Sequence, residues 1–550
     1  MPRNARKYVF VVGGVMSGIG KGISTASIAR ILQSKGLSVT AIKIDPYINI
    51  DAGTMNPTEH GEVFVLADGY ETDQDMGNYE RFLDITLPEI NYITTGRVYM
   101  EVIRRERNLE YKGKNVEVVP DIPLEVIHRI ETASEEARAD VTLIEIGGTI
   151  GEYQNIIFLE AARMMKLKRP NDVAVIMVSY VPVPGHIGEM KTKPTQYASR
   201  SLNSVGLQAD IILARAEIPL DDKRKEKMAV FCNISAERVI SAPDVQSIYD
   251  VPLNFERDGL GRILCEILGL PNRKADLRAW KRFVAKSHNG HEEVKIAVVG
   301  KYFDTGDFVL SDAYLSVIEA VKFSAIALGK RAKISWINSK DIEKKPRMVN
   351  ELAKYDGIIV PGGFGESGVE GKIQAIRYAR EHKIPYLGLC YGMQLMVVEY
   401  ARNVLKLKDA HTAEIKKDTG DPVVDVMLEQ KKHLADNKYG GTMRLGVYPA
   451  YLKKGTMARA AYKKELVEER HRHRYEINPA YVKRLEEAGL VFSGTSPDHV
   501  LMEIAELPRS VHPFMLGTQF HPELQARPLA PHPLFTAFLT AAMARKKKRK

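Results

Sequence analysis

The chain has 550 residues, a length that favours two to four domains and excludes a single small fold. Hydrophobic residues make up 45% and charged residues 27%, proportions that exclude a disordered chain. The net charge is +10, but six of the positive charges lie in the terminal run 545–550. Such a run is usually a solvated tail, so we expect no nucleic-acid partner for the folded body.

The cysteines and the apolar pattern indicate a cytoplasmic protein. Cys232, Cys265 and Cys390 are odd in number and far apart, unlike a disulfide framework, which indicates a reducing compartment. The basic N-terminus lacks a small-residue cleavage site, and no apolar run reaches the roughly 18 residues of a membrane span. We therefore expect neither secretion nor a membrane partner.

The first half of the chain alternates short apolar runs with helix-like segments. We predict a strand at 8–12, a helix at 23–34 and a strand at 37–44. Further predicted strands lie at 141–146, 173–179 and 211–214. This alternation predicts an α/β fold in which helices cover both faces of a parallel sheet.

A second α/β unit follows a polar break. Residues 271–292 carry Pro-Asn-Arg-Lys at one end and Ser-His-Asn-Gly-His at the other, which predicts an interdomain linker. The strand pattern restarts at 294–300, 356–361, 385–389 and 515–520. We thus predict a first domain at 1–270, a linker at 271–292, a second domain at 293–543 and a basic tail at 544–550.

A glycine-rich loop, residues 13–22, joins the first predicted strand to the first predicted helix. Backbone N–H groups and the positive helix end can hold phosphate oxygens there, and Lys21 adds a charge for the outer phosphates. The loop departs from the standard Walker spacing by one residue, and Gly22 replaces the Ser or Thr that usually holds Mg²⁺. Asp75 and Glu145, at predicted strand ends, are candidate metal ligands. The alternative is that the glycines only form a tight turn and that Asp75 and Glu145 are surface residues.

Residues 191–196, Lys-Thr-Lys-Pro-Thr-Gln, are basic and rich in hydroxyl groups. Such a loop suits a second phosphate group, and a plain solvated loop is the alternative. Together with the phosphate loop it indicates a site for two nucleotides.

The second half carries a candidate cysteine nucleophile. Cys390 has a glycine two residues to either side, after an apolar strand and before a helix-like segment, which is the arrangement of a nucleophile elbow. The helix dipole favours its thiolate. His521, directly after another apolar strand, would take the thiol proton, and Glu523 would fix the tautomer of the imidazole. The N–H of Tyr391 and one from the loop 361–365 would bind the oxyanion.

The basic run 469–475, Glu-Arg-His-Arg-His-Arg-Tyr, has three interpretations. It could be a metal site, a nucleic-acid patch or a charged strand. Zinc usually takes closed ligand sets, and no cysteine or acid cluster lies nearby in the sequence. An arginine that clamps a substrate carboxylate is the more economical interpretation.

Both halves together resemble the CTP synthase family, in which a P-loop-type parallel-sheet amidoligase domain is joined to a class I glutamine amidotransferase α/β domain. The resemblance covers nearly all of residues 7–540 and is carried by residues 43–49, 61–64, 191–196, 440–446 and 470–475. It implies that ATP phosphorylates O4 of UTP, and that ammonia from glutamine displaces the phosphate to give CTP in pyrimidine biosynthesis. It also implies Mg²⁺, GTP as an allosteric activator, feedback by CTP, and a homotetramer that can stack into filaments.

The resemblance assigns roles by position. It places ATP and phosphate binding at Ser17, Gly18, Ile19, Gly20, Lys21, Gly22, Lys43, Asp75, Arg215 and Asp244, and Mg²⁺ at Asp75 and Glu145. It places UTP and CTP binding at Ser17, Glu152, Tyr153, Gln154, Lys191, Thr192, Lys193, Pro194, Thr195, Gln196 and Lys227. It places glutamine binding at Gly363, Tyr391, Gly392, Met393, Gln394, Glu414 and Arg474, catalysis at Cys390, His521 and Glu523, and an ammonia passage between domains at His60.

Four sites depart from the family pattern. Gly18 replaces a second Ser of the phosphate loop, and residues 152–154, Glu-Tyr-Gln, replace the Asp-Ile-Glu that recognises the product. Ser367 replaces an Arg in the 365–371 loop, and Tyr391 replaces a Leu beside the nucleophile. The first three bear on UTP binding, CTP feedback and GTP activation, whereas the elbow needs only the backbone N–H of Tyr391.

Two other functions fit parts of the sequence. Another ATP-dependent amidoligase fused to a glutaminase, such as a cobyrinic acid diamide synthase, predicts a carboxylate substrate, and residues 191–196 argue against it. A filament-forming scaffold of weak activity fits the departures. A scaffold has no physical need for both candidate sites together, which argues against that function.

Overall fold

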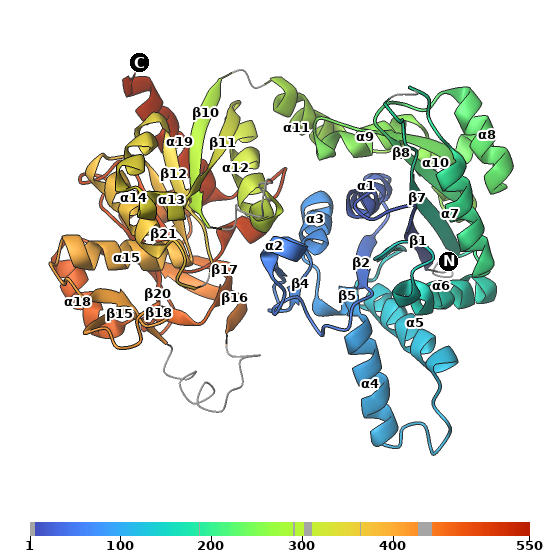
Figure 1. Ribbon diagram of the computed structural model, residues 1–550, viewed down its shortest axis with the longest axis horizontal. Helices are drawn as coiled ribbons and strands as arrows, with labels where there is room; N and C mark the ends of the chain where they lie inside the picture. Colours follow the sequence, from blue (N-terminus) through green and yellow to red (C-terminus); the bar gives the residue numbers. More distant parts are fainter. Residues whose placement is uncertain are drawn as a thin grey trace. The chain divides into compact units, whose positions relative to one another are not determined.

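The computed structural model describes residues 6–185, 188–289, 292–301, 311–363, 365–426 and 443–549. Motif residues 440–442 and residue 364 therefore lie outside the described part of the chain. The chain divides into two compact units (Figure 1). Unit 1 comprises residues 1–52 and 75–284, and unit 2 comprises residues 53–74 and 285–550. Both are α/β, which confirms the predicted fold class.

Unit 1 is built on a seven-stranded sheet in the order β5-β2-β6-β1-β7-β8-β9. Every neighbouring pair is parallel. The strands are β1 (Lys7–Gly14), β2 (Val39–Asp45), β5 (Tyr92–Thr94), β6 (Val141–Ile146), β7 (Val173–Tyr180), β8 (Ile211–Ala216) and β9 (Val239–Pro243). The central strands are buried almost throughout, as continuous apolar runs predict for a sheet covered on both faces.

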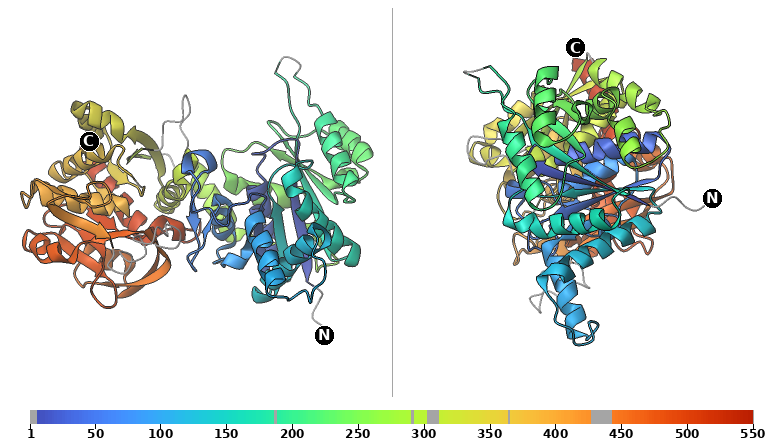
Figure 2. Two further views of the ribbon diagram at one scale, coloured as in Figure 1. Left: turned by 60° about the horizontal axis from the view of Figure 1, so that its bottom comes forward. Right: turned by 90° about the vertical axis from the view of Figure 1, so that its right-hand side faces the viewer.

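Helices cover both faces of this sheet (Figure 2). They are α1 (Lys21–Ser34), α3 (Gln74–Leu83), α4 (Thr95–Arg107), α5 (Val118–Glu136), α6 (Ile156–Lys168), α7 (Lys193–Ser204), α8 (Asp222–Cys232), α9 (Val251–Arg257), α10 (Leu260–Ile267) and α11 (Arg278–Asn289). The phosphate loop lies where β1 ends and α1 begins, so the sheet presents this loop at the carboxyl ends of its strands.

Unit 2 has a nine-stranded mixed sheet in the order β11-β10-β12-β13-β21-β20-β19-β16-β17. Its parallel part holds β10 (Glu293–Gly300), β11 (Arg331–Asn338), β12 (Gly357–Val360), β13 (Tyr386–Leu389) and β21 (Met515–Thr518). Its antiparallel part holds β16 (Arg444–Leu452), β17 (Leu466–His473), β19 (Val491–Thr495) and β20 (Met502–Glu506). Smaller sheets hold β3 (Phe64–Val65) with β4 (Glu71–Thr72), and β14 (Ala410–Thr412) with β15 (Asp421–Val426) and β18 (Tyr475–Ile477).

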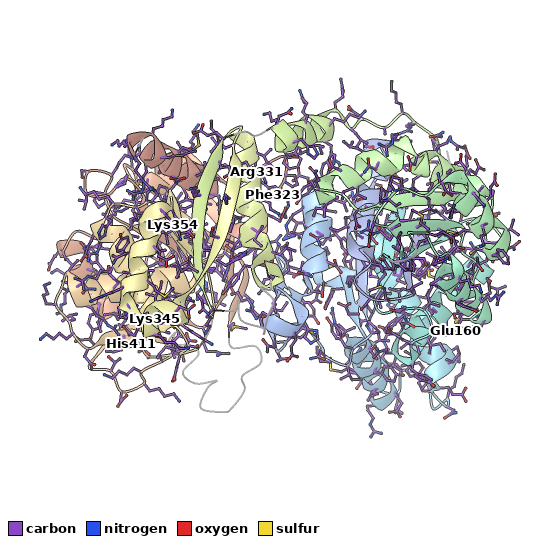
Figure 3. The ribbon with its side chains drawn as sticks, turned by 45° about the horizontal axis from the view of Figure 1, so that its top comes forward. Glu160, Phe323, Arg331, Lys345, Lys354 and His411 are labelled. Carbon is purple, nitrogen blue, oxygen red and sulfur yellow. The ribbon has the colours of Figure 1, made fainter. Side chains whose placement is uncertain are left out.

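Unit 2 has eight α-helices among its described residues, and several of them pack against the nine-stranded sheet. The eight are α2 (Pro57–His60), α12 (Leu315–Ala327), α13 (Ser339–Lys344), α14 (Val369–Glu381), α15 (Tyr391–Asn403), α17 (Met457–Tyr462), α18 (Pro479–Glu487) and α19 (Pro533–Arg549). Helices α12 and α19 pack together, and α14 packs beside α15. Phe323 of α12 is fully buried (Figure 3).

Residues 53–74 belong to unit 2, although they lie between β2 and α3 of unit 1 in the sequence. Val447 of β16 donates its N–H to the carbonyl of Ala67 at 2.9 Å. Gly446 has φ +91°, and a Cβ there would lie 2.7 Å from the nitrogen of Gly69, so this backbone crossing requires glycine. Arg470 donates to the carbonyl of Val65 at 3.1 Å. Strand β17 and its neighbour thus hold the 53–74 segment through backbone and side-chain contacts.

Two segments outside the predicted domains, the linker and the basic tail, contain helix. Within the predicted linker, α11 places Trp280 in the core of unit 1, where its indole N–H donates to the carbonyl of Tyr249 at 2.8 Å. The basic tail continues α19 as far as Arg549, and Lys546 forms an ion pair with Glu292 at 3.3 Å. Among the described residues, no helix is long and apolar enough to cross a membrane.

Candidate active sites

Cys390 occupies a strained turn between β13 and α15. Its φ of 49° and ψ of −99° place it outside the common regions for a non-glycine residue. Its backbone N–H donates to the carbonyl of Thr518 at 2.6 Å. A Cβ at Gly392 would overlap the carbonyl oxygen of Val360, so helix α15 could not start this close to β12 with another residue there. The predicted strand, turn and helix around the cysteine are therefore present.

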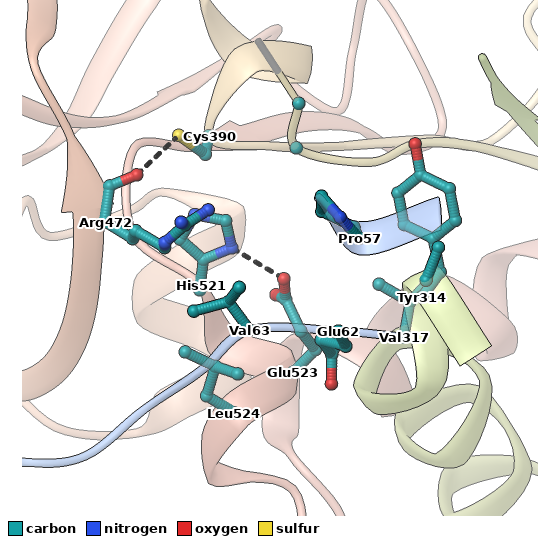
Figure 4. Close-up of a pocket in the computed structure, with 13 residues that line it drawn as sticks. Pro57, Glu62, Val63, Tyr314, Val317, Cys390, Arg472, His521, Glu523 and Leu524 are labelled. Atoms are coloured by element: carbon teal, nitrogen blue, oxygen red, sulfur yellow. Dashed lines mark hydrogen bonds and ion pairs between the residues drawn. The ribbon is translucent and has the colours of Figure 1, made fainter. Parts of the chain in front are cut away.

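The imidazole of His521 lies between Cys390 and Glu523 (Figure 4). Its Nδ1 lies 2.7 Å from Oε1 of Glu523. Burial lowers the pKa of His521, but the carboxylate of Glu523 and the thiolate of Cys390 outweigh it and raise this pKa to about 10. This electrostatic setting favours the imidazolium form of His521. The structure thus brings together the three residues predicted for catalysis.

A cavity of about 80 Å³ opens beside these residues. It is lined by Gly362, Gly363, Arg472, Ala313, Tyr314, Val317 and Leu524, together with Pro57, Glu62 and Val63 of the 53–74 segment (Figure 4). The carboxylate of Glu62 accepts hydrogen bonds from the backbone N–H of Ser316 at 3.0 and 3.1 Å, which fixes the segment against the start of α12. His60 is exposed at the end of α2, and its place in an ammonia passage stays a prediction.

The residues predicted to bind glutamine surround this region. The side-chain amide of Gln394 donates to the carbonyl of Tyr475 at 2.8 Å, and Glu414 accepts from the N–H of Gly365 at 2.9 Å. Burial raises the pKa of Glu414, while that hydrogen bond and the charges of Lys301 and Arg474 act in the opposite direction. A carboxylate and a guanidinium whose charges interact can pair with the ammonium and carboxylate groups of an amino acid.

The raised pKa of Glu414 predicts weaker glutamine binding in acid. Because burial favours the neutral carboxyl, this group protonates at a higher pH than an exposed glutamate as the pH falls. We expect the KM for glutamine to rise as the pH falls from 8 to 5.5. Steady-state glutaminase assays across this range measure the effect. The variant Glu414→Gln should have a high KM that changes little over the same range, whereas a parallel rise in both proteins would contradict the assignment.

In unit 1, the phosphate loop and a charged cluster lie together. Gly18 and Gly20 have φ of +71° and +80°, and the Nζ of Lys21 donates to the carbonyl of Gly148 at 2.9 Å. Burial lowers the pKa of Lys21. The Nζ of Lys43 lies 3.0 Å from Oε1 of Glu145 and forms an ion pair with Asp75.

The charges in this cluster offset one another. Burial raises the pKa of Asp75, but the ammonium groups of Lys43 and Lys21 outweigh it and hold this pKa below its usual value. Burial raises the pKa of Glu145. The carboxylates of Asp75 and Glu145 suit Mg²⁺. This ion binds through one or two carboxylates and completes its shell with water and nucleotide phosphates. Among the described residues, no cluster of three or more metal-ligating side chains offers an all-protein cage.

The structure explains the missing Ser or Thr at the end of the phosphate loop. A Cβ at Gly22 would overlap Oδ1 of Asp75, so the carboxylate occupies the space that a side chain would need. An acid from α3 thus excludes the side chain that a standard loop carries at this position.

Arg215 and Asp244 form an ion pair at 2.8 Å near the same loop. Arg215 lines a cavity of about 150 Å³ together with Gly18, Gly20, Ser24, Pro243 and Phe255. The assignment of Arg215 and Asp244 to the ATP side stays a prediction.

The residues predicted to bind UTP and CTP differ in their exposure. Thr192, Thr195 and Gln196 are buried. The hydroxyl groups of Thr195 and Ser179 are hydrogen-bonded at 2.9 Å, and the amide of Gln196 donates to the hydroxyl of Thr192 at 3.1 Å. Lys193 is exposed in the first turn of α7. The exposed members further include Lys227 on α8, and Tyr153 and Gln154 after β6, with Tyr153 96% exposed, whereas Glu152 is half-buried.

Some residues of these sites were not found from the sequence. Tyr79 donates to Glu145, Lys372 lies with its Nζ 5.1 Å from the ring of Tyr391, and Gln519 donates to the sulfur of Cys390. Only Gln519 had an indication in the sequence, since it lies two residues before His521 at the end of a predicted strand.

Comparison with known proteins agrees with both halves. Residues 7–270 match the family CTP synthase N-terminus, and residues 309–541 match the family Glutamine amidotransferase class-I. A CTP synthase of Thermococcus gammatolerans is 51% identical over 542 residues, which cover 98% of this chain and 99% of that protein. The chain belongs to the CTP synthase family. A CTP synthase of Caldanaerobacter subterraneus is 50% identical over 539 residues, covering 98% of each chain.

Among solved structures, the chain is similar to the glutaminase domain of a Trypanosoma brucei CTP synthase with bound acivicin. That match has 37% identity and a TM-score of 0.42, and it covers 46% of this chain and 94% of the other. Membership of the CTP synthase family confirms the predicted activity: the enzyme makes CTP from UTP with ATP and glutamine. The carboxylate-amidating and scaffold alternatives are thereby set aside.

Proposed function

We propose that the enzyme hydrolyses glutamine at Cys390 and aminates UTP beside the phosphate loop. The observation that carries this proposal is that one chain holds two complete chemical groupings. One is the thiol, imidazole and carboxylate set of unit 2, and the other is the lysine and carboxylate cluster of unit 1. The first is suited to acyl transfer and the second to phosphoryl transfer.

In the glutaminase reaction, the thiol proton of Cys390 moves to His521, and the sulfur attacks the side-chain amide carbon of glutamine. Glu523 holds the imidazolium, and N–H groups of Gly363 and Tyr391 bind the oxyanion. His521 then returns its proton to the leaving nitrogen, so ammonia departs. Water hydrolyses the thioester, which releases glutamate and restores the thiol.

The glutamine itself is held by its charged ends. Glu414 binds the α-ammonium group, Arg474 binds the α-carboxylate, and Gln394 contacts the substrate from the first turn of α15, where Gly392 and Met393 supply backbone. The charges of Glu414 and Arg474 influence each other, which supports their place in one pocket.

In the synthase reaction, O4 of UTP attacks the γ-phosphorus of ATP and ADP leaves. Ammonia then adds at C4, and phosphate leaves to give CTP. Lys21 and Lys43 neutralise charge on the transferred group. Asp75 and Glu145 would hold Mg²⁺, which neutralises phosphate charge when bound. Arg215 belongs to the ATP side with Asp244, and Ser17 and residues 18–20 contribute to phosphate binding.

Lys193 provides a test of the UTP side. Its ammonium is exposed at the start of α7, where it can reach a phosphate group together with the helix N-terminus. We expect Lys193→Ala to raise the KM for UTP about tenfold, because a charge-assisted contact is lost. The matched control is Arg200→Ala, an exposed cation further along the same helix that stacks over Tyr197. Equal KM values for the two variants would remove Lys193 from the UTP site.

The remaining features follow the family. We propose a synthase domain at 1–270, a linker at 271–292, a glutaminase domain at 293–543 and a basic tail at 544–550. We also propose activation by GTP, feedback by CTP, a homotetramer that can form filaments, a cytoplasmic location, and ammonia transfer past His60. The substitutions at Ser367 and at residues 152–154 make GTP and CTP titrations of the purified enzyme the direct measurements of the two allosteric responses.

A further inference from the structure

Gln519 lies against the sulfur of the candidate nucleophile. Its side chain is fully buried, and its Nε2 donates to Sγ of Cys390 at 3.7 Å. A carboxamide excluded from water needs partners for its donor and its acceptor, because unpaired polar groups are costly in the interior. One of those partners is the sulfur.

The direction of the Gln519 amide follows from its neighbours. Gln394 donates from Nε2 to the carbonyl of Tyr475 at 2.8 Å, which fixes the orientation of the Gln394 amide. The same Nε2 donates to Oε1 of Gln519 at 3.3 Å. If the Gln519 amide were turned over, two NH₂ groups would face each other. The hydrogen-bond chain therefore runs from Gln394 to Gln519 and ends with an N–H directed at the sulfur.

The backbone fixes this contact. Leu389 and Thr518 are partners in the parallel register of β13 and β21, so Cys390 and Gln519 emerge side by side from adjacent strands. The N–H of Gln519 donates to the carbonyl of Glu503 at 2.8 Å. A donor held by a sheet is preorganised, so it loses little conformational freedom when charge develops beside it.

The second polar neighbour of the sulfur cannot stabilise a thiolate. The thiol of Cys390 donates to the carbonyl of Arg472 at 3.7 Å, and this contact depends on the thiol proton. Once the proton has moved to His521, the carbonyl oxygen faces a negative sulfur. The amide of Gln519 can still donate, and to a thiolate it donates more strongly than to a thiol.

We propose that Gln519 is a catalytic residue of glutamine hydrolysis that donates a hydrogen bond to the thiolate of Cys390. This inference rests on the proposed nucleophilic role of Cys390. Gln519 transfers no proton: the thiol proton goes to His521 and the sulfur electron pair forms the bond to the amide carbon. A hydrogen bond makes the thiolate less basic, which increases the fraction of Cys390 that is ionised. It also makes each thiolate less nucleophilic, but by only about half as much on a logarithmic scale. The same N–H also assists departure of the thiolate when the thioester is hydrolysed.

Two variants separate this role from packing. Gln519→Leu removes the donor, whereas Gln519→Glu keeps the shape and replaces the NH₂ group by an oxygen. The rate at which iodoacetamide alkylates Cys390 is measured from pH 5 to pH 10 on the full-length enzyme, by mass spectrometry of the Cys390 peptide. We expect the midpoint of this pH profile to rise by about one to two pH units in Gln519→Leu and further in Gln519→Glu.

Activity completes the test. We expect glutaminase kcat at neutral pH to fall about 10- to 100-fold in both variants, while ammonium-dependent CTP formation is unchanged. A packing role predicts a normal profile for Gln519→Leu, which fills the same space without a donor. An unmoved midpoint in Gln519→Glu would overturn the proposal even if Gln519→Leu failed to fold. If alkylation of Cys390 left the parent glutaminase active, the proposed nucleophile would itself be wrong, a result distinct from failure of the Gln519 proposal.

Discussion

We expect Cys390→Ala to abolish CTP formation from glutamine and to leave CTP formation from ammonium intact. Loss of a nucleophile removes the covalent route altogether, so the glutamine-dependent rate should fall by at least ~10⁴-fold. Ammonium needs no glutaminase, because unit 1 contains its own charged cluster of Lys43, Asp75 and Glu145. The measurement is the steady-state rate of CTP formation from UTP, ATP and Mg²⁺ with each nitrogen source, with and without GTP.

The matched control for this variant is Cys232→Ala, which removes a different buried thiol that belongs to unit 1. That variant should use both nitrogen sources. Equal loss of both activities in Cys390→Ala would mean that the substitution damages the fold, whereas retained use of glutamine would exclude the cysteine as nucleophile. In the parent, the ratio of rates with and without GTP measures the proposed GTP activation.

Both candidate sites were largely predictable because each follows a buried strand with a glycine-rich turn. Strand β6 has the predicted bounds, and Cys390 lies at the predicted elbow. Strand β1 extends beyond the predicted 8–12 because Gly13 and Gly14 pair with Val178 and Ser179 of β7. Glycines in a sequence indicate a turn, and only the partner strand shows that the ladder continues through them.

The 53–74 segment could not be assigned from the sequence. Its place depends on partners roughly 250 to 400 residues away, which leave no local pattern. These partners also explain the basic strand β17. Arg470 donates to Val65 and Arg472 forms an ion pair with Glu71 at 2.7 Å. The alternation of the run thus serves the docking of this segment, and Arg474 beyond the strand is the arginine beside Glu414.

The cluster in unit 1 was only half predictable, since the sequence indicates single acids but not their contacts. Lys43, Asp75 and Glu145 come from three different elements, and the parallel sheet brings the two strand residues side by side in the β2–β6 register. Helix α3 then places Asp75 against Gly22. Gly22, the departure from the standard phosphate loop, therefore leaves the space that the carboxylate of Asp75 occupies.

This pairing predicts that restoring the usual residue destroys activity. The variant Gly22→Ser introduces the hydroxyl of a standard phosphate loop, but its Cβ would overlap Oδ1 of Asp75. The carboxylate must move, which breaks its ion pair with Lys43 and displaces a proposed Mg²⁺ ligand. We expect CTP formation to fall more than about 100-fold with glutamine and with ammonium alike, because misplacement of a group by about one ångström has this effect on positioning.

Glutamine hydrolysis and the double variant show whether the effect is local. Glutaminase activity belongs to unit 2 and should be retained in Gly22→Ser, measured in the absence of UTP. The control Gly18→Ser adds the same side chain where nothing lies within 4 Å of the new Cβ, so only its φ of +71° should cost stability, about 1 kcal/mol. Combining Gly22→Ser with Asp75→Gly clears the overlap but removes the carboxylate. If that double variant regained CTP formation, the introduced hydroxyl would be able to replace the carboxylate of Asp75. If it stayed inactive, the carboxylate itself would be required.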